Sequence, residues 1–195
     1  MGGKDHVRAA LEAAGGEASL AAGAAAIGEE ATRAILAQLA ALRREVRGPA
    51  GHALDEVTDE ELDKTFRTNI YGYFYMAKAA LRHIPRGGSI INCGSITGLE
   101  GSKELLDYAS TKGAIHAFTK SLAQNTVERG IRVNCVAPGP VWTPLNPAER
   151  EDDDIECFGA GTPMGRPAQP EEIAPAYVYF ASNADSSYVT GHVLP

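Results

Sequence analysis

Two short apolar segments, separated by one long helix-prone stretch, constrain the fold of this chain more than any other feature. The apolar segments are residues 89–93 and 131–137, and residues 106–129 between them have the spacing of a helix. Short apolar runs of this kind are typical of strands buried on both faces of a parallel sheet. Because parallel strands are joined by a crossover helix, the sequence predicts a strand-helix-strand unit and an α/β fold.

The remaining regular elements follow the same alternation. Thr58 and Glu61 match a capping box, which predicts that a long helix begins at this point. Pro170 is well placed for the first turn of another helix. In all, we expect helices at about residues 29–47, 58–83 and 170–180 and a final strand at residues 191–194. The pattern predicts a parallel sheet with helices on both faces, in a single domain that spans residues 1–195.

The composition excludes several classes of function. The chain has 195 residues, a formal net charge of -7 and 18 Lys and Arg residues that form no basic run, so we expect no nucleic-acid partner. The five histidines have no metal-ligand spacing, which predicts no metal site. The sequence contains no apolar run long enough for a membrane span, and we expect no membrane association.

The three cysteines, Cys93, Cys135 and Cys157, are an odd number without close pairing. Cys93 and Cys135 lie inside apolar, strand-like runs, which predicts buried, reduced thiols. Reduced thiols are typical of the cytoplasm, so we expect a cytoplasmic protein.

Three polar residues near the first strand form a chemically useful set. Ser95 comes just after that strand, and Tyr108 and Lys112 lie one helical turn apart, on one face of the next helix. At this separation a lysine ammonium stabilises the phenolate form of a tyrosine, which makes the tyrosine a usable proton donor and acceptor near neutral pH. A carbonyl compound held by Ser95 can exchange a proton with Tyr108, while the hydride must come from a cofactor.

The position of these residues supports a common site. In open parallel α/β sheets, ligands bind beyond the carboxyl ends of the strands, where both Ser95 and the segment from Pro138 to Thr143 fall. Taken singly, each residue has a plainer explanation: Ser95 as a turn residue, Asn69 as a surface amide and Pro138 as a strand terminator. Their joint order and spacing favour a functional site.

Several separate motifs together resemble the short-chain dehydrogenase/reductase family. They are Ser95 with Tyr108 and Lys112, Thr68-Asn69-Ile70, residues 132–139 and Gly165-Arg166-Pro167. In addition, Trp142-Thr143-Pro144-Leu145 is similar to the glucose/ribitol-type members. The resemblance covers about residues 51–194. It implies a Rossmann-type sheet and the interconversion of a small alcohol with a ketone or aldehyde, with NAD or NADP as cofactor.

The resemblance also implies a role for each matching residue. Tyr108 would be the general acid/base, Ser95 would orient the carbonyl, and Lys112 would bind the nicotinamide ribose while tuning Tyr108. Asn69 would hold a water that leads to Lys112. The nicotinamide site would be lined by Pro138, Gly139, Val141 and Thr143. Family members commonly form subunit interfaces with the helices from Thr58 and Leu106, which implies a homodimer or homotetramer.

The N-terminal part departs from the family pattern. The family begins with a strand and a Thr-Gly-x-x-x-Gly-x-Gly turn that approaches the pyrophosphate, and no such turn occurs here. Residues 5–18 and 27–47 are similar to the family's second and third helices, so we expect the first strand-helix-strand unit to be lacking. Gly48-Pro49-Ala50-Gly51 stands where the family has Asn-Asn-Ala-Gly.

Two hypotheses about function therefore stay open. The chain is either an active NAD(P)-dependent oxidoreductase or a truncated, catalytically silent homologue that acts as an oligomerising or binding module. The sequence does not indicate whether the cofactor would be NAD or NADP, because the residue that selects between them belongs to the N-terminal unit that we expect to be lacking. Residues 146–162, where the family selects its substrate, carry no recognisable chemistry, and small polyols or sugars are suggested only by the motif around Trp142.

Overall fold

The computed structural model describes residues 54–143 and 158–195. The helix expected at residues 29–47, the departures from the family before residue 54, most of the segment 146–162 and Cys157 lie outside the described residues.

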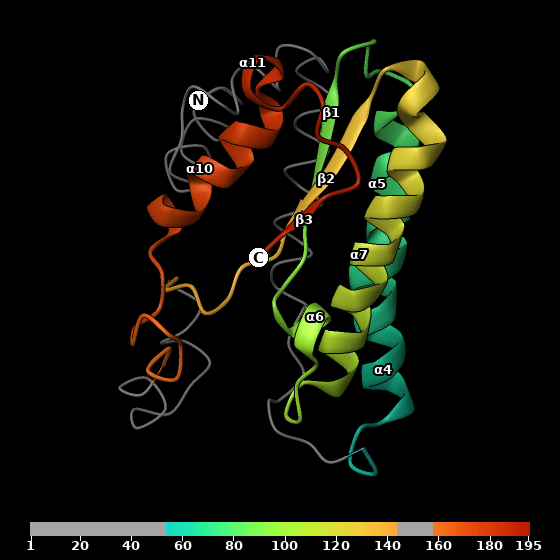
Figure 1. The fold of residues 1–195 in the computed structure, drawn as a ribbon. Helices are drawn as coiled ribbons and strands as arrows, with labels where there is room; N and C mark the ends of the chain where they lie inside the picture. Colours follow the sequence, from blue (N-terminus) through green and yellow to red (C-terminus); the bar gives the residue numbers. More distant parts are fainter. Residues whose placement is uncertain (1–53, 144–157) are drawn as a thin grey trace, which may run out of the picture.

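The described part of the chain contains a parallel three-stranded sheet in the order β1-β2-β3. Its strands are β1 (Ser89–Cys93), β2 (Arg132–Val136) and β3 (Val193–Leu194). In the register of β1 and β2, Ser89 lies opposite Arg132 and Cys93 lies opposite Val136, so both strands end at one level. All three strands were predicted, and the parallel pairing confirms the α/β class (Figure 1).

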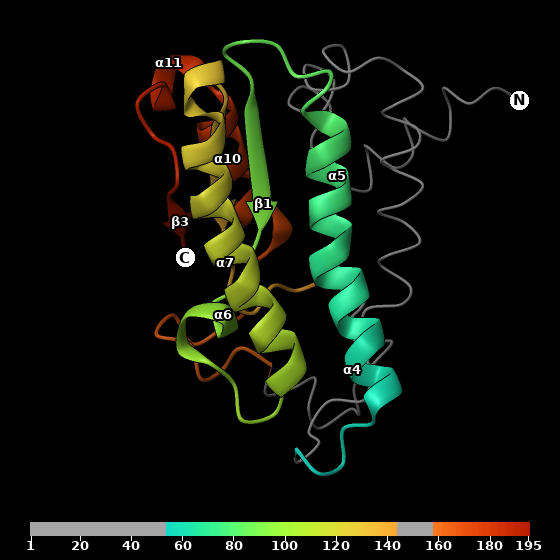
Figure 2. The same ribbon diagram turned by 90° about the vertical axis from the view of Figure 1, so that its right-hand side faces the viewer.

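One face of the sheet is covered by α7 (Leu106–Thr126), which continues as a 3₁₀ turn, η2 (Val127–Arg129). The helical stretch therefore ends at Arg129, as the predicted range of 106–129 implies, and is capped by Gly130, whose φ of 68° is the left-handed conformation that glycine adopts without strain. Beside α7 lie α4 (Asp59–Phe66), the π-helical turn η1 (Arg67–Tyr71) and α5 (Gly72–Ala80) (Figure 2). Thr58 and Glu61 form the predicted capping box. The π-helical turn within this long helix was not predicted.

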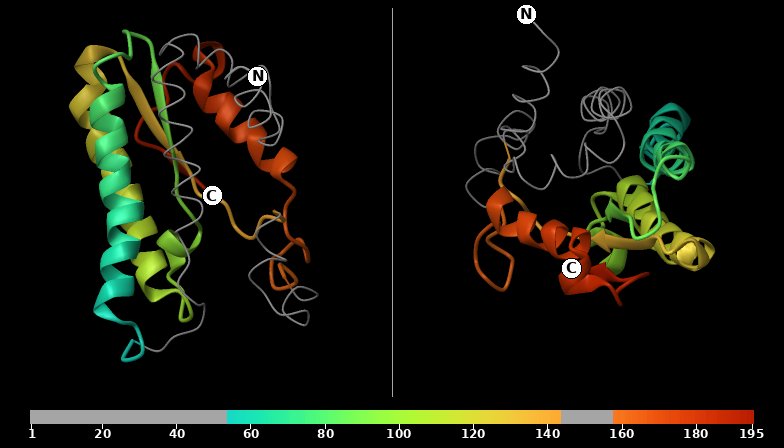
Figure 3. Two further views of the ribbon diagram at one scale, coloured as in Figure 1. Left: turned by 180° about the vertical axis from the view of Figure 1, so that it is seen from behind. Right: turned by 90° about the horizontal axis from the view of Figure 1, so that it is seen from above.

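The opposite face is covered by α10 (Pro170–Ala181), with Pro170 in the first turn, followed by the short α11 (Asn183–Ser186). Seen from behind, α5 and α10 lie on opposite sides of β1 (Figure 3). The prediction of helices on both faces is therefore confirmed for the described residues. The loop after β1 contains one more short helix, α6 (Thr97–Glu100), which packs against α7.

Apolar side chains between α5, α7 and β2 form the core under the first face. Ala77, Leu122, Ala123 and Val133 are buried together there. Burying a side chain of the size of leucine or valine contributes about 1.5–3 kcal/mol, so this cluster fixes α7 against the sheet. The position of α7 matters because its first turns carry Tyr108 and Lys112.

The buried guanidinium of Arg132 fixes the second face at the start of β2. It donates hydrogen bonds to the Phe180 carbonyl oxygen (2.9 Å), Asn183 Oδ1 (3.0 Å) and Ser186 Oγ (3.0 Å). Burial lowers the pKa of this arginine, and neutral acceptors satisfy its donors. The contacts attach α10 and α11 to the sheet.

Cys93 does not follow the expectation of a buried thiol. It is exposed, whereas Cys135 is fully buried, and both thiols are free. Side chains alternate along a strand, so Cys93, the last residue of β1, points to the opposite face from its buried neighbour Asn92.

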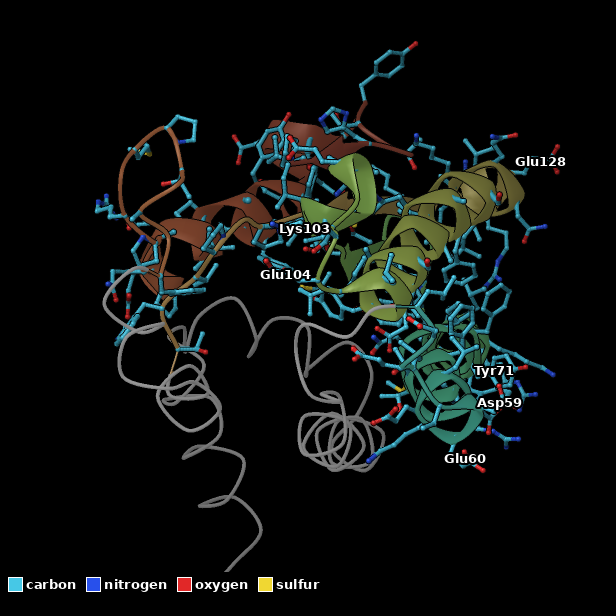
Figure 4. The ribbon with its side chains drawn as sticks, turned by 90° about the horizontal axis from the view of Figure 1, so that it is seen from below. Asp59, Glu60, Tyr71, Lys103, Glu104 and Glu128 are labelled. Carbon is cyan, nitrogen blue, oxygen red and sulfur yellow. The ribbon has the colours of Figure 1, made fainter. Side chains whose placement is uncertain are left out.

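The outer surface of α4, η1 and α5 is polar at one end and aromatic at the other. Asp59, Glu60 and Tyr71 project away from the sheet (Figure 4), and Tyr71, Phe74 and Tyr75 are exposed. Among residues 54–143 and 158–195, no helix is long and apolar enough to cross a membrane.

Candidate active site

The candidate site lies at the carboxyl ends of β1 and β2. Two backbone hydrogen bonds join the segments that follow these strands: Gly94 N–H donates to the Val136 carbonyl (2.7 Å) and Ile96 N–H donates to the Pro138 carbonyl (3.0 Å). The structure therefore brings Ser95 beside Pro138, at the edge of the sheet where ligands of such folds bind.

The Ser95 hydroxyl is held in a defined donor geometry. Its Oγ accepts a hydrogen bond from the Thr97 N–H (3.2 Å) and another from the Thr97 hydroxyl (2.9 Å). A hydroxyl has two acceptor lone pairs and one hydrogen, so both acceptor positions are filled and the hydrogen is left to donate. The side chain is buried, which makes a well-placed donor more effective than it would be in water.

Tyr108 and Lys112 lie together on α7, as their spacing predicts. The Lys112 Nζ lies 5.4 Å from the centre of the Tyr108 ring, within the range of a cation-π interaction. Lys112 is 8% exposed, and its Nζ donates a hydrogen bond to the Cys93 carbonyl (2.9 Å). An ammonium carries three donor hydrogens, so two remain after this bond.

Asn69 is tied to the same turn of α7 through Thr111. Asn69 Nδ2 donates to Thr111 Oγ1 (3.1 Å), and Thr111 Oγ1 donates to the Tyr108 carbonyl (2.7 Å). Asn69 is buried and lies in the π-helical turn η1, an irregularity that is frequent at functional sites because it redirects the backbone. Asn69, Tyr108 and Lys112 thus form one connected group.

The segment after β2 lies along the segment that precedes α10. Val141 pairs with Ala168 in a parallel bridge, Trp142 N–H donates to the Ala168 carbonyl (2.7 Å), and Ala168 N–H donates to the Pro140 carbonyl (2.9 Å). Gly139 is exposed, and a Cβ placed on it would meet no atom within 4 Å. Thr143 is half-buried at the end of the described segment.

A comparison with protein families agrees with this arrangement. A family model described as enoyl-(acyl carrier protein) reductase matches residues 14–195. The chain belongs to the short-chain dehydrogenase/reductase family. Its fold is accordingly the Rossmann-type α/β fold that the resemblance implied.

Curated members of the short-chain dehydrogenase/reductase family are similar over most of the chain. The uncharacterized oxidoreductase YhxC of Bacillus subtilis is 54% identical over 142 residues, which are 73% of this chain and 50% of that protein. The NADPH-dependent aldehyde reductase 1, chloroplastic, of Arabidopsis thaliana is 51% identical over 141 residues, 72% of this chain and 49% of that protein. The glucose and ribitol dehydrogenase of Daucus carota is 51% identical over 141 residues, which are 72% of this chain and 48% of that protein. The chain thus spans about half the length of these relatives.

Three side chains at this short-chain dehydrogenase/reductase site were not found from the sequence. Tyr73 Oη donates to the Cys93 carbonyl (2.9 Å), which also accepts from Lys112, and burial raises the pKa of Tyr73 so that it stays a donor. Thr111 links Asn69 to Tyr108, and His116 lies under Ser95. Tyr73 follows Asn69, and His116 follows Lys112, by one helical turn, so a search one turn beyond each predicted residue finds both.

Within residues 54–143 and 158–195, no group of three or more His, Cys, Asp or Glu side chains is arranged to hold a metal ion.

Proposed function

We propose that this chain is an NAD(P)-dependent oxidoreductase that interconverts an alcohol with a ketone or aldehyde, with Tyr108 as the general acid/base. One observation carries the proposal: the Lys112 ammonium lies over the Tyr108 ring, 5.4 Å from its centre, at the carboxyl end of the sheet. This arrangement places a positive charge beside the phenol that would give and take the proton.

Each residue of the site has a distinct part in this reaction. In alcohol oxidation, Tyr108 Oη takes the proton of the substrate hydroxyl group, and in carbonyl reduction it returns that proton. Ser95 donates its hydroxyl hydrogen to the substrate oxygen, because Thr97 fills both acceptor positions of Ser95 Oγ. This donor stabilises the negative charge that develops on that oxygen.

Lys112 and Asn69 support Tyr108. Lys112 keeps a fixed positive charge near the phenol through its bond to the Cys93 carbonyl. Asn69 fixes the turn of α7 that carries Tyr108, through Thr111. We propose further that Asn69 holds a water that exchanges protons with Lys112.

The described residues fit the nicotinamide half of a dinucleotide. Lys112 has two ammonium hydrogens left for ribose hydroxyl groups, and the open surface at Gly139 lets a flat ring approach the backbone. We therefore assign Pro138, Gly139, Val141 and Thr143 to this half of the cofactor site, with Tyr108 and Lys112. When bound, the nicotinamide supplies or accepts the hydride.

A binding and turnover experiment tests the proposal. NADH and NADPH are titrated against the purified chain by fluorescence. The oxidation of D-glucose and ribitol by NAD⁺ or NADP⁺ and the reduction of propionaldehyde by NADH or NADPH are followed by cofactor absorbance. We expect saturable binding and turnover. The absence of saturable binding would refute the oxidoreductase function for these 195 residues and favour a catalytically silent binding module.

The substitution Tyr108→Phe tests the mechanism. It removes the phenolic proton but keeps the ring against Lys112, so kcat should fall by about 10²–10⁴-fold, the usual contribution of general acid/base catalysis, while dinucleotide affinity is retained. Tyr75→Phe, on an exposed tyrosine, is the matched control and should keep full activity. Full activity in Tyr108→Phe would overturn the assigned role.

We also propose that the chain forms one domain and assembles as a homodimer or homotetramer in the cytoplasm. The exposed aromatic residues Tyr71, Phe74 and Tyr75 support an interface between copies of the chain. The free thiols of Cys93 and Cys135 support a reducing compartment. Light scattering of the purified chain tests the assembly.

A further inference from the structure

His116 is a buried titratable group that the proposed mechanism leaves unused. It is 4% exposed and lies on α7, one turn beyond Lys112. Its Nδ1 atom is buried and has no hydrogen-bond partner in good geometry among the described residues. Buried polar atoms without a partner are rare in folded proteins and call for an explanation.

The other ring nitrogen of His116 contacts the backbone of Ser95. The Ser95 N–H points at His116 Nε2, at 3.4 Å. An imidazole nitrogen accepts a hydrogen bond only when it carries no proton, so this contact requires a neutral ring with its proton on Nδ1. The contact joins the loop that carries Ser95 to the helix that carries Tyr108 and Lys112.

Two glycines leave the space that the imidazole occupies. A Cβ placed on Gly94 would overlap His116 Nε2, and one placed on Gly98 would lie 2.8 Å from His116 Cε1. Gly94 and Gly98 flank Ser95, so the ring is packed directly against the backbone on either side of the serine. A displacement of this ring therefore displaces Ser95.

The surroundings of His116 favour the neutral ring. Burial lowers its pKa, and the charges of Lys112 and Lys120 on the same helix lower it further, while the Gly98 carbonyl opposes them. From β2, Cys135 presents a thiol whose pKa burial raises to about 11, so it is uncharged. Glu100, the charged residue of α6, is exposed, and β1 carries no charged residue.

We propose that His116 is a positioning residue: its neutral imidazole holds the Ser95 loop against α7 through Nε2, and protonation of the ring releases that loop. The inference rests on the proposed function for the role of Ser95 in turnover, but the contact itself can be tested without turnover. Because a protonated Nε2 can no longer accept the Ser95 N–H, acid should disturb the serine while the rest of the fold persists.

Nuclear magnetic resonance of the full chain tests the contact directly. Between pH ~7.5 and ~5, which spans the ordinary histidine pKa, we expect the Ser95 amide resonance to shift with a midpoint below the ordinary histidine value. In His116→Gln, whose side-chain amide can accept the same bond but does not titrate, the shift should disappear. In the matched control His83→Gln, at an exposed histidine, it should remain. A Ser95 amide that does not respond to pH in the unsubstituted chain would overturn the proposal.

The pH dependence of kcat provides the second measurement. A positioning role predicts an acid limb that is lost in His116→Gln with most of the activity retained. It also predicts a fall in kcat of about 10–100-fold in His116→Phe, which keeps a ring but no acceptor, as expected for a misplaced catalytic group. Equal activity in the Phe and Gln variants would indicate simple packing and refute the proposal. Absence of turnover at every pH, with a titrating Ser95 amide, would refute the proposed function and leave the role of His116 standing.

Discussion

The substitution Thr111→Val tests the connection that places Asn69 and Tyr108 in one group. Thr111 is fully buried, and its Oγ1 accepts from Asn69 Nδ2 (3.1 Å) and donates to the Tyr108 carbonyl (2.7 Å). Valine has nearly the shape of threonine but neither of these bonds. The change therefore removes the link and leaves the packing of α7 almost unaltered.

The expected loss of stability follows from the two bonds. Leaving the buried Asn69 amide without an acceptor costs about 1–3 kcal/mol, and losing the bond to the Tyr108 carbonyl costs about 0.5–1.5 kcal/mol. The free energy of unfolding should therefore fall by about 2–4 kcal/mol. With a urea m-value of about 2 kcal/mol per M, the midpoint should fall by about 1–2 M.

Urea unfolding followed by circular dichroism measures this loss. Ser110→Ala is the matched control: Ser110 donates a similar bond to the Leu106 carbonyl from the exposed side of α7, and its loss should change stability by less than about 0.5 kcal/mol. A double-mutant cycle with Asn69→Ala should give a coupling energy of about 1–2 kcal/mol. A Thr111→Val variant that unfolds at the same urea concentration as the unsubstituted chain, with a coupling energy near zero to Asn69→Ala, would refute this link.

Three further perturbations probe other parts of the structure. Gly98→Ala would place a Cβ 2.6 Å from the Lys112 backbone carbonyl carbon, so the free energy of unfolding measured in urea should fall by about 1–3 kcal/mol. Gly139→Ala is the control, because a Cβ there meets no atom within 4 Å, and it should leave the stability unchanged. Phe180→Ala removes a fully buried ring and should cost about 3–5 kcal/mol in the same measurement. The Arg166 guanidinium lowers the pKa of Glu172 to about 2 from 4.5, so this carboxylate contributes stability that is present above pH 4.5 and lost as pH falls toward 2. The melting temperature of Glu172→Gln should therefore decline less steeply over that window than that of the unsubstituted chain, and an identical decline would contradict the assignment.

Within residues 54–143 and 158–195, the predicted strands and helices were recovered because their signals are local. The apolar runs at residues 89–93 and 131–137 can be satisfied only by burial, and the Thr58 capping box satisfies backbone donors within one helical turn. The π-helical turn at Asn69 was not predicted, because an extra residue in one turn depends on what packs beside it. The exposure of Cys93 depends on what packs over the face of the sheet to which its side chain points, which the apolar pattern of the strand does not show.

The candidate site was only partly readable from the sequence. Tyr108 and Lys112 share a helix, so their proximity follows from the helical repeat alone. The partners Tyr73, Thr111 and His116 are given their roles by contacts with distant segments. The spacing places Tyr73 and His116 one turn beyond predicted residues but does not show which distant groups they contact. The roles of the individual site residues stay predictions until the variants are measured.

The sequence by itself determined the class of fold, the family and the chemistry available at Ser95, Tyr108 and Lys112, because periodicity, capping and residue type are encoded within a few neighbouring positions. The tertiary structure decided how that chemistry is oriented. The packing of η1 and of the Ser95 loop against α7 ties Asn69 to Tyr108 through Thr111 and places His116 beneath the serine. These contacts join residues that are far apart in the chain, and their geometry depends on the angle at which helix meets sheet.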